Sequence, residues 1–306
     1  MKPLKIKGII TPMVTPLLDN DTIDAEGARA LADHLIEGGV SAIFLLGTTG
    51  EAQSISERLR KEFICTVTRH VAGRVPVLVA VTDTSMEESI ELARHAKECG
   101  ADALVAAAPY YFPGNQKELV RYYKALADKL PLPLFLYNMP SKVKVFLNVD
   151  SVLELSKHPN IIGIKDSSAN MSYFVRLIHY FAGTDFSVYM GPEEQTSAAV
   201  LLGADGGVNG GSNLYPELFV SMYKAAERGD LNETRRLQDR IMSLSEALYN
   251  LTPDSDGSFA CSIKCALYLK GIIKSSYMAY PFIRFDKELE DKVKTILGDL
   301  DSKGYK

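Results

Sequence analysis

Ile161-Ile162-Gly163-Ile164-Lys165-Asp166 is a short apolar run, rich in β-branched residues, that ends abruptly in a lysine and an aspartate. A run of this kind is typical of a parallel strand that is buried on both faces. Burying an ammonium group is costly, so a lysine at the rim of such a strand is ion-paired, extends to water, or is kept as a neutral amine for chemistry. The surrounding sequence has to distinguish an ordinary ion-paired lysine from a reactive one.

Short apolar runs alternate with longer amphipathic ones along most of the chain. Eight strand-then-helix units require parallel strands with right-handed crossovers, and eight units close into a (β/α)₈ TIM barrel. A doubly wound sheet is the alternative, but no G-x-G-x-x-G turn follows an early strand. The expected strands are residues 8–11, 42–46, 75–81, 103–108, 134–137, 161–165, 186–190 and 206–208, and the expected helices are residues 25–38, 56–71, 85–99, 117–128, 149–157, 171–181, 193–202 and 216–228.

The strand pattern stops beyond residue 228. Helical patterns at residues 231–248, 262–272 and 286–297, with a polar loop at residues 250–257, predict a C-terminal helical extension. No linker composition separates this segment from the rest of the chain. We therefore expect a barrel over residues 1–230 and an extension, residues 231–306, that packs on it.

Composition excludes several classes of protein. The chain has 306 residues, a hydrophobic content of 46% and a formal net charge of −4, values typical of a protein with a large core. No basic stripe favours nucleic acid, and no apolar run approaches the ~20 residues of a membrane-spanning helix. The first residues are positive like a signal peptide, but Pro12, Pro16 and Asp19 interrupt the apolar stretch after them. We expect this start to lead into the first strand of a soluble, cytoplasmic protein.

The cysteines and histidines show no metal-binding or redox motif. Cys65, Cys99, Cys261 and Cys265 form no C-x-x-C pair and lie in helical patterns, so buried free thiols are expected. The five histidines also lie in or at the end of helical patterns, without a second ligand type at H-E-x-x-H or similar spacing. No metal site is expected.

Catalytic groups of such a barrel lie at the carboxyl ends of its strands. Gly47-Thr48-Thr49-Gly50-Glu51 follows the second strand, and its small and hydroxyl residues expose N–H groups that could hold a carboxylate. Tyr110-Tyr111 follows the fourth strand, Tyr137 ends the fifth and Lys165 ends the sixth. A lysine beside a phenol can condense with a ketone to give a Schiff base while the tyrosine shuttles protons.

Each of these features has a simpler interpretation. Tyr137 could be a plain aromatic residue at a strand end. The glycines of Gly206-Gly207-Val208-Asn209-Gly210-Gly211 could only narrow the eighth strand for packing. The same loop could hold a phosphate, although no lysine or arginine lies close to it in sequence.

Four motifs at four separate strand ends together resemble the dihydrodipicolinate synthase and N-acetylneuraminate lyase family of class I, pyruvate-handling aldolases. The resemblance runs from about residue 6 to the C-terminal helices. The motifs are Gly47-Thr48-Thr49-Gly50-Glu51, Tyr137-Asn138-Met139-Pro140, Gly163-Ile164-Lys165-Asp166 and Gly203-Ala204-Asp205-Gly206-Gly207.

The resemblance implies a role for each matching residue. Lys165 would form the Schiff base with pyruvate or another 2-oxo acid, and Tyr137 would be the proton shuttle. The turn Gly47-Thr48-Thr49 would hold the carboxylate of the oxo acid, with the Thr48 hydroxyl passing protons on. Tyr111 would match a tyrosine that reaches across a dimer interface to complete this relay, which implies a homodimer or homotetramer. The family's chemistry needs no cofactor or metal.

Two departures from the resemblance concern the second substrate. The synthases follow Y-N-x-P-S with an arginine that holds its carboxylate, whereas Lys142 keeps the charge without the planar, two-pronged geometry. Lys144 stands where the family usually has a glycine.

Gly191-Pro192-Glu193-Glu194 is similar to the Gly-x-Asp-Glu of the sialic acid lyases, whose acidic pair binds sugar hydroxyls. The alternative is that both glutamates only lie at a helix N-terminus, where the dipole favours them.

The sequence therefore predicts a Schiff-base lyase that reversibly converts a 2-oxo acid into pyruvate and an aldehyde derived from a sugar acid or an acyl amino sugar. One alternative is 4-hydroxy-tetrahydrodipicolinate synthase activity on pyruvate and aspartate semialdehyde. A silent 2-oxo-acid sensor is another, and a barrel with Lys165 as an anion clamp and a glutamate metal site is the third. Further substrate contacts are expected from Lys142, Gly191, Glu193, Glu194, Val208, Asn209 and Ser212.

Overall fold

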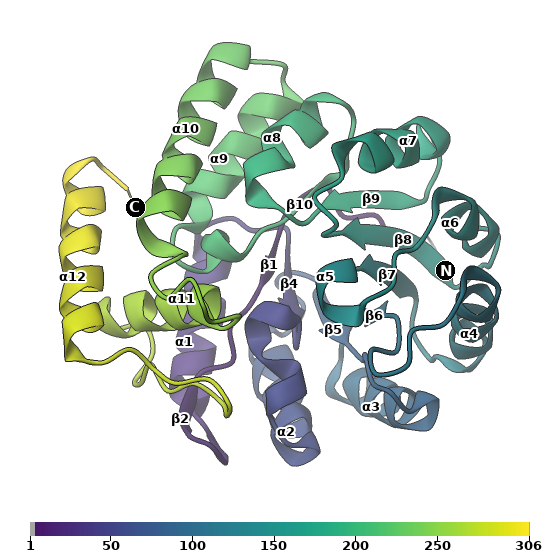
Figure 1. The fold of residues 1–306 in the computed structure, drawn as a ribbon, viewed down its shortest axis with the longest axis horizontal. Helices are drawn as coiled ribbons and strands as arrows, with labels where there is room; N and C mark the ends of the chain where they lie inside the picture. Colours follow the sequence, from purple (N-terminus) through teal and green to yellow (C-terminus); the bar gives the residue numbers. More distant parts are fainter. Residues whose placement is uncertain (1–3, 306) are drawn as a thin grey trace.

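The computed structural model describes residues 4–305, in which eight parallel strands close into a barrel surrounded by helices (Figure 1). The predicted TIM barrel is confirmed, and the strands neighbour one another in the order β1-β10-β9-β8-β7-β6-β5-β4. They are β1 (Gly8–Pro12), β4 (Ala42–Leu45), β5 (Val77–Ala80), β6 (Ala103–Ala107), β7 (Leu134–Asn138), β8 (Ile161–Asp166), β9 (Ser187–Met190) and β10 (Gly206–Val208).

A helix follows each barrel strand, close to its predicted range. The Ser56 hydroxyl caps α2 by accepting a hydrogen bond from the Leu59 N–H at 3.3 Å. Gly100 ends α3 with a φ of 98°, a conformation that glycine adopts without steric cost. The helices are α1 (Ala25–Glu37), α2 (Glu57–Val71), α3 (Met86–Cys99), α4 (Gln116–Lys129), α6 (Val149–Leu155), α7 (Met171–Phe181), α8 (Glu193–Leu201) and α9 (Pro216–Glu227).

Some short elements were not predicted. The strands β2 (Leu17–Asp19) and β3 (Thr22–Ile23) form a small hairpin, and they are too short to show a periodic pattern. The helix α5 (Pro140–Val143) follows β7 almost directly. It ends at Lys144, whose φ of 59° lies in the left-handed region. Glycine would adopt this conformation without steric cost, whereas a lysine needs support from its surroundings.

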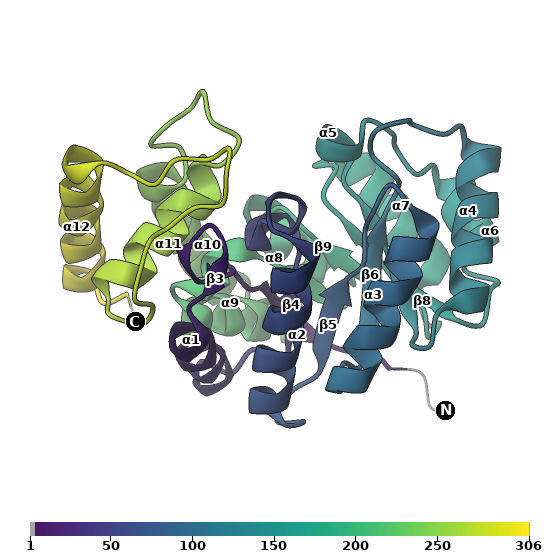
Figure 2. The same ribbon diagram turned by 90° about the horizontal axis from the view of Figure 1, so that it is seen from below.

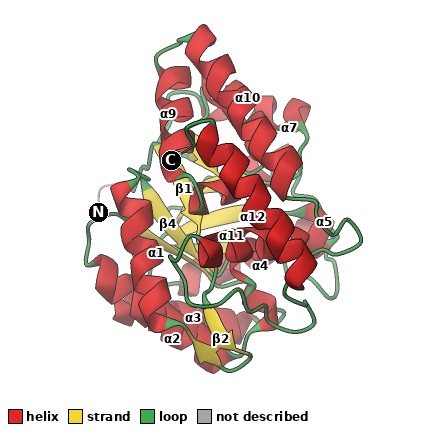
Figure 3. Cartoon of the chain, turned by 90° about the vertical axis from the view of Figure 1, so that its left-hand side faces the viewer, coloured by secondary structure: helices red, strands yellow, loops and turns green. Residues whose placement is uncertain are grey.

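The C-terminal helices α10 (Leu231–Leu248), α11 (Ser258–Leu269) and α12 (Lys287–Ser302) lie against one side of the barrel (Figures 1 and 3). In Figure 2 the loop between α10 and α11 rises at the same end of the barrel as α5. The extension therefore approaches the end where the strand carboxyl termini lie. Among residues 4–305, no helix is long and apolar enough to cross a membrane.

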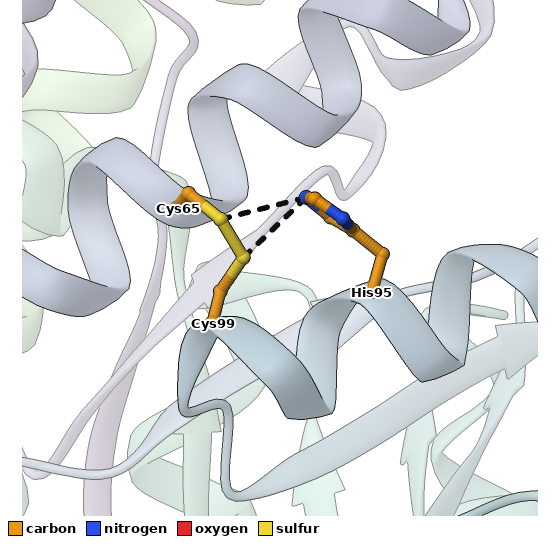
Figure 4. A group of neighbouring side chains, drawn as sticks. All are labelled: Cys65, His95 and Cys99. Atoms are coloured by element: carbon orange, nitrogen blue, oxygen red, sulfur yellow. Dashed lines mark hydrogen bonds between the residues drawn. A yellow bond between two sulfur atoms is a disulfide. The ribbon is translucent and has the colours of Figure 1, made fainter.

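Cys65 on α2 and Cys99 at the end of α3 form a disulfide that joins these two outer helices (Figure 4). The prediction of free thiols is therefore wrong for this pair, although Cys261 and Cys265 are free and buried as predicted. The pairing has no local signal because the two cysteines are 34 residues apart in sequence and are brought together by the adjacent packing of α2 and α3.

His95 lies one helical turn before Cys99, with its Nε2 atom 3.5 Å from the Cys65 sulfur and 3.4 Å from the Cys99 sulfur. His95 and Cys99 are four residues apart, so the prediction that the histidines lack a second ligand type at H-E-x-x-H or similar spacing is wrong as well. The same Nε2 donates a hydrogen bond to the Lys61 carbonyl at 3.0 Å. While the sulfurs are joined to each other, neither is a thiolate that could bind a metal.

Candidate active site

Lys165 and Tyr137 lie side by side at the carboxyl ends of β8 and β7, where they are register partners. The Lys165 Nζ atom lies 4.3 Å from the centroid of the Tyr137 ring and 5.3 Å from that of Phe44. Lys165 is only 7% exposed, and within residues 4–305 no carboxylate forms a salt bridge with it. The amine is thus held against aromatic faces, which argues against an ordinary ion-paired lysine.

Asp166, the next residue of β8, points to the opposite face of the strand. Its carboxylate accepts hydrogen bonds from the Asn138 side-chain amide at 2.7 Å and from the Ser168 hydroxyl at 2.9 Å. Burial raises the pKa of Asp166, and these hydrogen bonds oppose the rise. The contact between Asn138 and Asp166 joins the ends of β7 and β8, and it therefore fixes the spacing of Tyr137 and Lys165.

The Tyr137 hydroxyl lies 3.3 Å from the Thr48 hydroxyl. Burial raises the pKa of Tyr137, but the charge of Lys165 and hydrogen bonds with Thr48 and Ser167 outweigh burial, so the pKa lies below its ordinary value of 10.0. A phenol with a lowered pKa exchanges protons more readily near neutral pH. Tyr137 and Thr48 thus form a hydroxyl pair beside the Lys165 amine.

Thr48 begins the 3₁₀ turn η1 (Thr48–Gly50), which directly follows β4 and is unusually constrained. Leu46 and Glu51, on either side of the turn, have φ angles of 60° and 55°. These left-handed conformations are costly for residues with side chains and persist only where the surroundings enforce them. A Cβ atom at Gly47 would lie 2.8 Å from the Phe44 ring, so only glycine fits there. The turn is therefore a rigid, preformed feature.

A cavity of about 260 Å³ lies beside Thr48 and Tyr137. Lys165 itself does not line the cavity, but its amine lies over the ring of Tyr137, which does. At its partly exposed edge the Lys142 Nζ atom forms a salt bridge of 2.9 Å with Asp256, from the loop before α11. The extension thus supplies part of the wall, which the sequence pattern did not indicate. The residues that it contributes are Asp256, Gly257, Ala260, Met278 and Phe282.

Tyr111 does not line this cavity, although the adjacent Tyr110 does. Its side chain is 75% exposed and packs edge-on against that of Phe112, which is 82% exposed, with ring centroids 4.9 Å apart. The tyrosine relay is therefore incomplete within one chain. A role for Tyr111 in the site of a second copy stays a prediction.

Glu193 and Glu194, at the start of α8, do not line the cavity. Glu193 is 5% exposed and accepts a hydrogen bond from the Gly211 N–H at 2.9 Å. Glu194 accepts one at 3.0 Å from the hydroxyl of Ser245 on α10. Burial raises the pKa of Glu193 to about 7, Tyr249 and Gly211 oppose the rise, and Glu194 adds to it. Their expected contact with a substrate stays a prediction that no contact in this cavity supports.

Glu193→Gln is expected to stabilise the protein above neutral pH. The folded pKa of about 7 exceeds the ordinary value of 4.5, so folding is favoured by a bound proton and this contribution is lost as pH rises from about 5 to 7. The difference between the folded and the ordinary pKa corresponds to about 3 kcal/mol in the free energy of unfolding. Urea unfolding between pH 5 and 8 should show a smaller pH dependence for the variant, with Glu194→Gln as the control. An unchanged pH dependence would show that Glu193 ionises normally.

The remaining predicted contacts are occupied by interactions within the protein. The Asn209 amide donates to the Gly191 carbonyl at 3.1 Å and to the Thr196 hydroxyl at 2.8 Å. The Ser212 hydroxyl lies 2.7 Å from that of Thr11. These bonds join β10 and the turn η3 (Gly210–Asn213) to β1 and to the loop after β9. Several predicted residues do not line the cavity, namely Lys165, Tyr111, Glu193, Glu194, Thr49, Gly191, Val208, Asn209 and Ser212.

The chain is similar to known proteins over nearly its whole length. A model of the dihydrodipicolinate synthetase family matches residues 5–300. The probable 2-dehydro-3-deoxy-D-pentonate aldolase YjhH of Escherichia coli K12 is 34% identical over 297 residues, which cover 96% of this chain and 97% of that protein. The solved structure of dihydrodipicolinate synthase from Bacteroides thetaiotaomicron is 48% identical, with a TM-score of 0.93, over 97% of this chain and 100% of that one. The structure of YagE from Escherichia coli K12, solved in complex with pyruvate, is 32% identical with a TM-score of 0.89, over 96% of this chain and 98% of that one.

Proposed function

The chain belongs to the dihydrodipicolinate synthetase family and is a lyase that forms a Schiff base with pyruvate, and we propose that Lys165 is the residue that forms it. The observation that carries this assignment is the contact of the buried Lys165 amine with Tyr137, whose hydroxyl reaches Thr48. These three residues come from three different strand ends, and the first two are aligned by the pairing of β7 with β8.

Each residue has a defined step in this proposal. The neutral Lys165 amine attacks the C2 carbonyl of the oxo acid, and the carbinolamine loses water when the Tyr137 hydroxyl protonates the departing oxygen. The Tyr137 phenolate left by that step takes the proton of the C4 hydroxyl while the protonated imine accepts the electron pair of the C3–C4 bond, which breaks to release an aldehyde and leave an enamine. Protonation of C3 and hydrolysis of the imine return pyruvate and the free lysine. The η1 turn holds the carboxylate with its N–H groups and the Thr48 hydroxyl.

The salt bridge between Lys142 and Asp256 supports a hydroxylated aldehyde as the second substrate. Asp256, which is largely exposed, partly neutralises Lys142 at the cavity edge and so weakens the attraction of this lysine for a substrate carboxylate. The hydrogen bond from Lys142 and its charge lower the pKa of Asp256, which therefore stays ionised and repels anions. Neutral polar groups on the wall, such as Thr82 and Gln53, are suited to sugar hydroxyls. A sugar-acid or acyl-amino-sugar aldehyde fits this wall better than aspartate semialdehyde does.

Condensation assays with pyruvate test the substrate class. Glycolaldehyde, glyceraldehyde and an N-acylated amino sugar are compared with aspartate semialdehyde, and the best hydroxylated aldehyde should show a kcat/KM at least about tenfold higher. Lys142→Arg combined with Asp256→Ala should reduce this ratio about tenfold, because it restores an unpaired guanidinium. Lys144→Arg, on the same turn but outside the cavity, is the control. Preference of the native protein for aspartate semialdehyde would establish the synthase alternative.

The assembly and location are also part of the proposal. A homodimer or homotetramer would bury the exposed Tyr111 and Phe112 and let Tyr111 complete the relay of a second copy. Sedimentation velocity with assays across a dilution series should then show turnover falling as the assembly dissociates.

A cytoplasmic location would mean that the Cys65–Cys99 disulfide is reduced in the cell, since glutathione and thioredoxin keep cytosolic thiols reduced. Thiol labelling after acid quenching of cells measures this state.

A further inference from the structure

A fully buried ion pair joins the C-terminal extension to the turn beside the catalytic groups. The Nζ atom of Lys264, on α11, lies 2.7 Å from the Glu51 Oε1 atom, and the two side chains are 0% and 2% exposed. The other carboxylate oxygen, Oε2, accepts a hydrogen bond from the Ala279 N–H at 2.8 Å. Both oxygens of Glu51 are therefore held by the extension.

Glu51 is in turn the residue that caps the C-terminal end of the η1 turn. Its N–H donates a hydrogen bond to the Thr48 carbonyl at 3.1 Å, and its own carbonyl accepts one from the Ser54 N–H at 2.9 Å. Its left-handed φ of 55° needs support from the surroundings. The side chain supplies that support, because it fixes Glu51 to α11 and to the segment before α12. A movement of Glu51 would therefore be transmitted directly to Thr48.

Stability alone is a weak reason to bury these two charges. Replacing a buried ion pair by apolar residues of similar volume is often neutral or stabilising. The pair is also directional, since the ammonium and the Ala279 N–H approach the carboxylate from two separate segments of the extension. Such directional hydrogen bonds hold the η1 turn in one position, because they weaken when the partners move. Apolar packing is not directional, so it would restrict the position of the turn less.

We propose that Glu51 and Lys264 are positioning residues for the oxo-acid carboxylate, through which the C-terminal extension holds the η1 turn in register with Tyr137. This inference rests on the proposed role of η1 in holding that carboxylate. Neither residue takes part in a chemical step, because both charged groups are occupied by each other and by Ala279. As a consequence, Glu51 and Lys264, which are more than 200 positions apart in sequence, jointly determine the affinity for pyruvate.

The test measures borohydride trapping of pyruvate as a function of pyruvate concentration. In Lys264→Met the half-saturating concentration should rise at least about tenfold, while the trapping rate at saturation changes less. Glu51→Gln, which is isosteric, should show the same direction. Lys274→Met is the matched control, since Lys274 also lies in the extension but forms an exposed pair with Glu26 and should leave the half-saturation unchanged.

The double variant Glu51→Gln with Lys264→Met separates positioning from stability. It contains no unpaired buried charge, so its thermal midpoint should recover relative to Lys264→Met, while its half-saturation should stay raised. The inference is overturned if the double variant recovers both its thermal midpoint and the native half-saturating pyruvate concentration. It is also overturned if folded single variants have the native half-saturating concentration. If Lys264→Met does not fold, the double variant decides. Failure of the native protein to trap pyruvate would instead refute the Schiff-base assignment.

Discussion

Lys165→Ala is expected to abolish covalent trapping of pyruvate and to reduce turnover by ~10⁴-fold or more, the scale of losing a catalytic nucleophile. Incubation of the native protein with pyruvate and borohydride should add the mass of one reduced pyruvate, and peptide mapping should place it on Lys165. The residue has no salt bridge to lose within residues 4–305, and alanine fits the space, so the variant should fold normally.

Lys165→Arg distinguishes a nucleophile from an anion clamp. A guanidinium keeps the positive charge but forms no imine with a ketone, so this variant should be as inactive as Lys165→Ala. Substantial activity in it would support the clamp. If that activity also disappeared with a chelator, a metal site would be indicated. Native protein that binds pyruvate reversibly without being trapped would establish the sensor alternative.

The sequence was sufficient for the barrel and for the residues on its strand ends. Strands that are buried on both faces appear in the sequence as apolar runs, such as Ile161–Asp166. Because a helix lies between successive strands, these strands must run parallel in one sheet. The register of Tyr137 with Lys165 follows from that topology, because residues at equivalent strand ends become neighbours. Catalytic candidates could therefore be predicted from position along the strands alone.

Contacts made by the C-terminal extension could not be predicted in the same way. Lys264 lies in the apolar helix Ser258–Leu269, where a lysine surrounded by Ile263, Cys265 and Ala266 was the one available signal of a buried charge. Its partner Glu51 is 213 residues away, and no periodicity relates the two. Asp256 lies in a loop whose course depends on packing, so its contact with Lys142 also had no local signal.

The acidic pair shows the limit of a motif taken by itself. Glu193 and Glu194 occupy the expected helix start, but their side chains turn toward Gly211 and α10. The first residues of a helix can project toward a strand end or toward a neighbouring helix, and tertiary packing decides which. Here the packing of α10 against α8 provides Ser245 as a partner for Glu194, while the Gly211 N–H is the partner of Glu193.

Tyr137→Phe is expected to reduce turnover by ~10²-fold or more while leaving pyruvate trapping detectable, since a general acid–base group contributes on this scale. The variant keeps the ring that faces the Lys165 amine and loses only the hydroxyl that reaches Thr48. Imine formation can still take its protons from water, so trapping remains detectable. A full turnover needs several proton transfers, and water supplies these less efficiently than the Tyr137 hydroxyl does. Steady-state rates and single-turnover trapping on the same samples separate the two effects.

The pH profile makes this prediction specific to the hydroxyl. Because Lys165 keeps the pKa of Tyr137 below 10.0, the phenol ionises at a lower pH than a free tyrosine. The pH profile of native turnover should therefore change slope where this phenol ionises, and the profile of Tyr137→Phe should lack that change. Tyr110→Phe is the matched control: Tyr110 lines the same cavity but burial raises its pKa, and its loss should change turnover by no more than about fivefold and leave that change of slope intact. Equal turnover in the native protein and Tyr137→Phe would remove Tyr137 from the mechanism and leave water or Thr48 as the proton carrier.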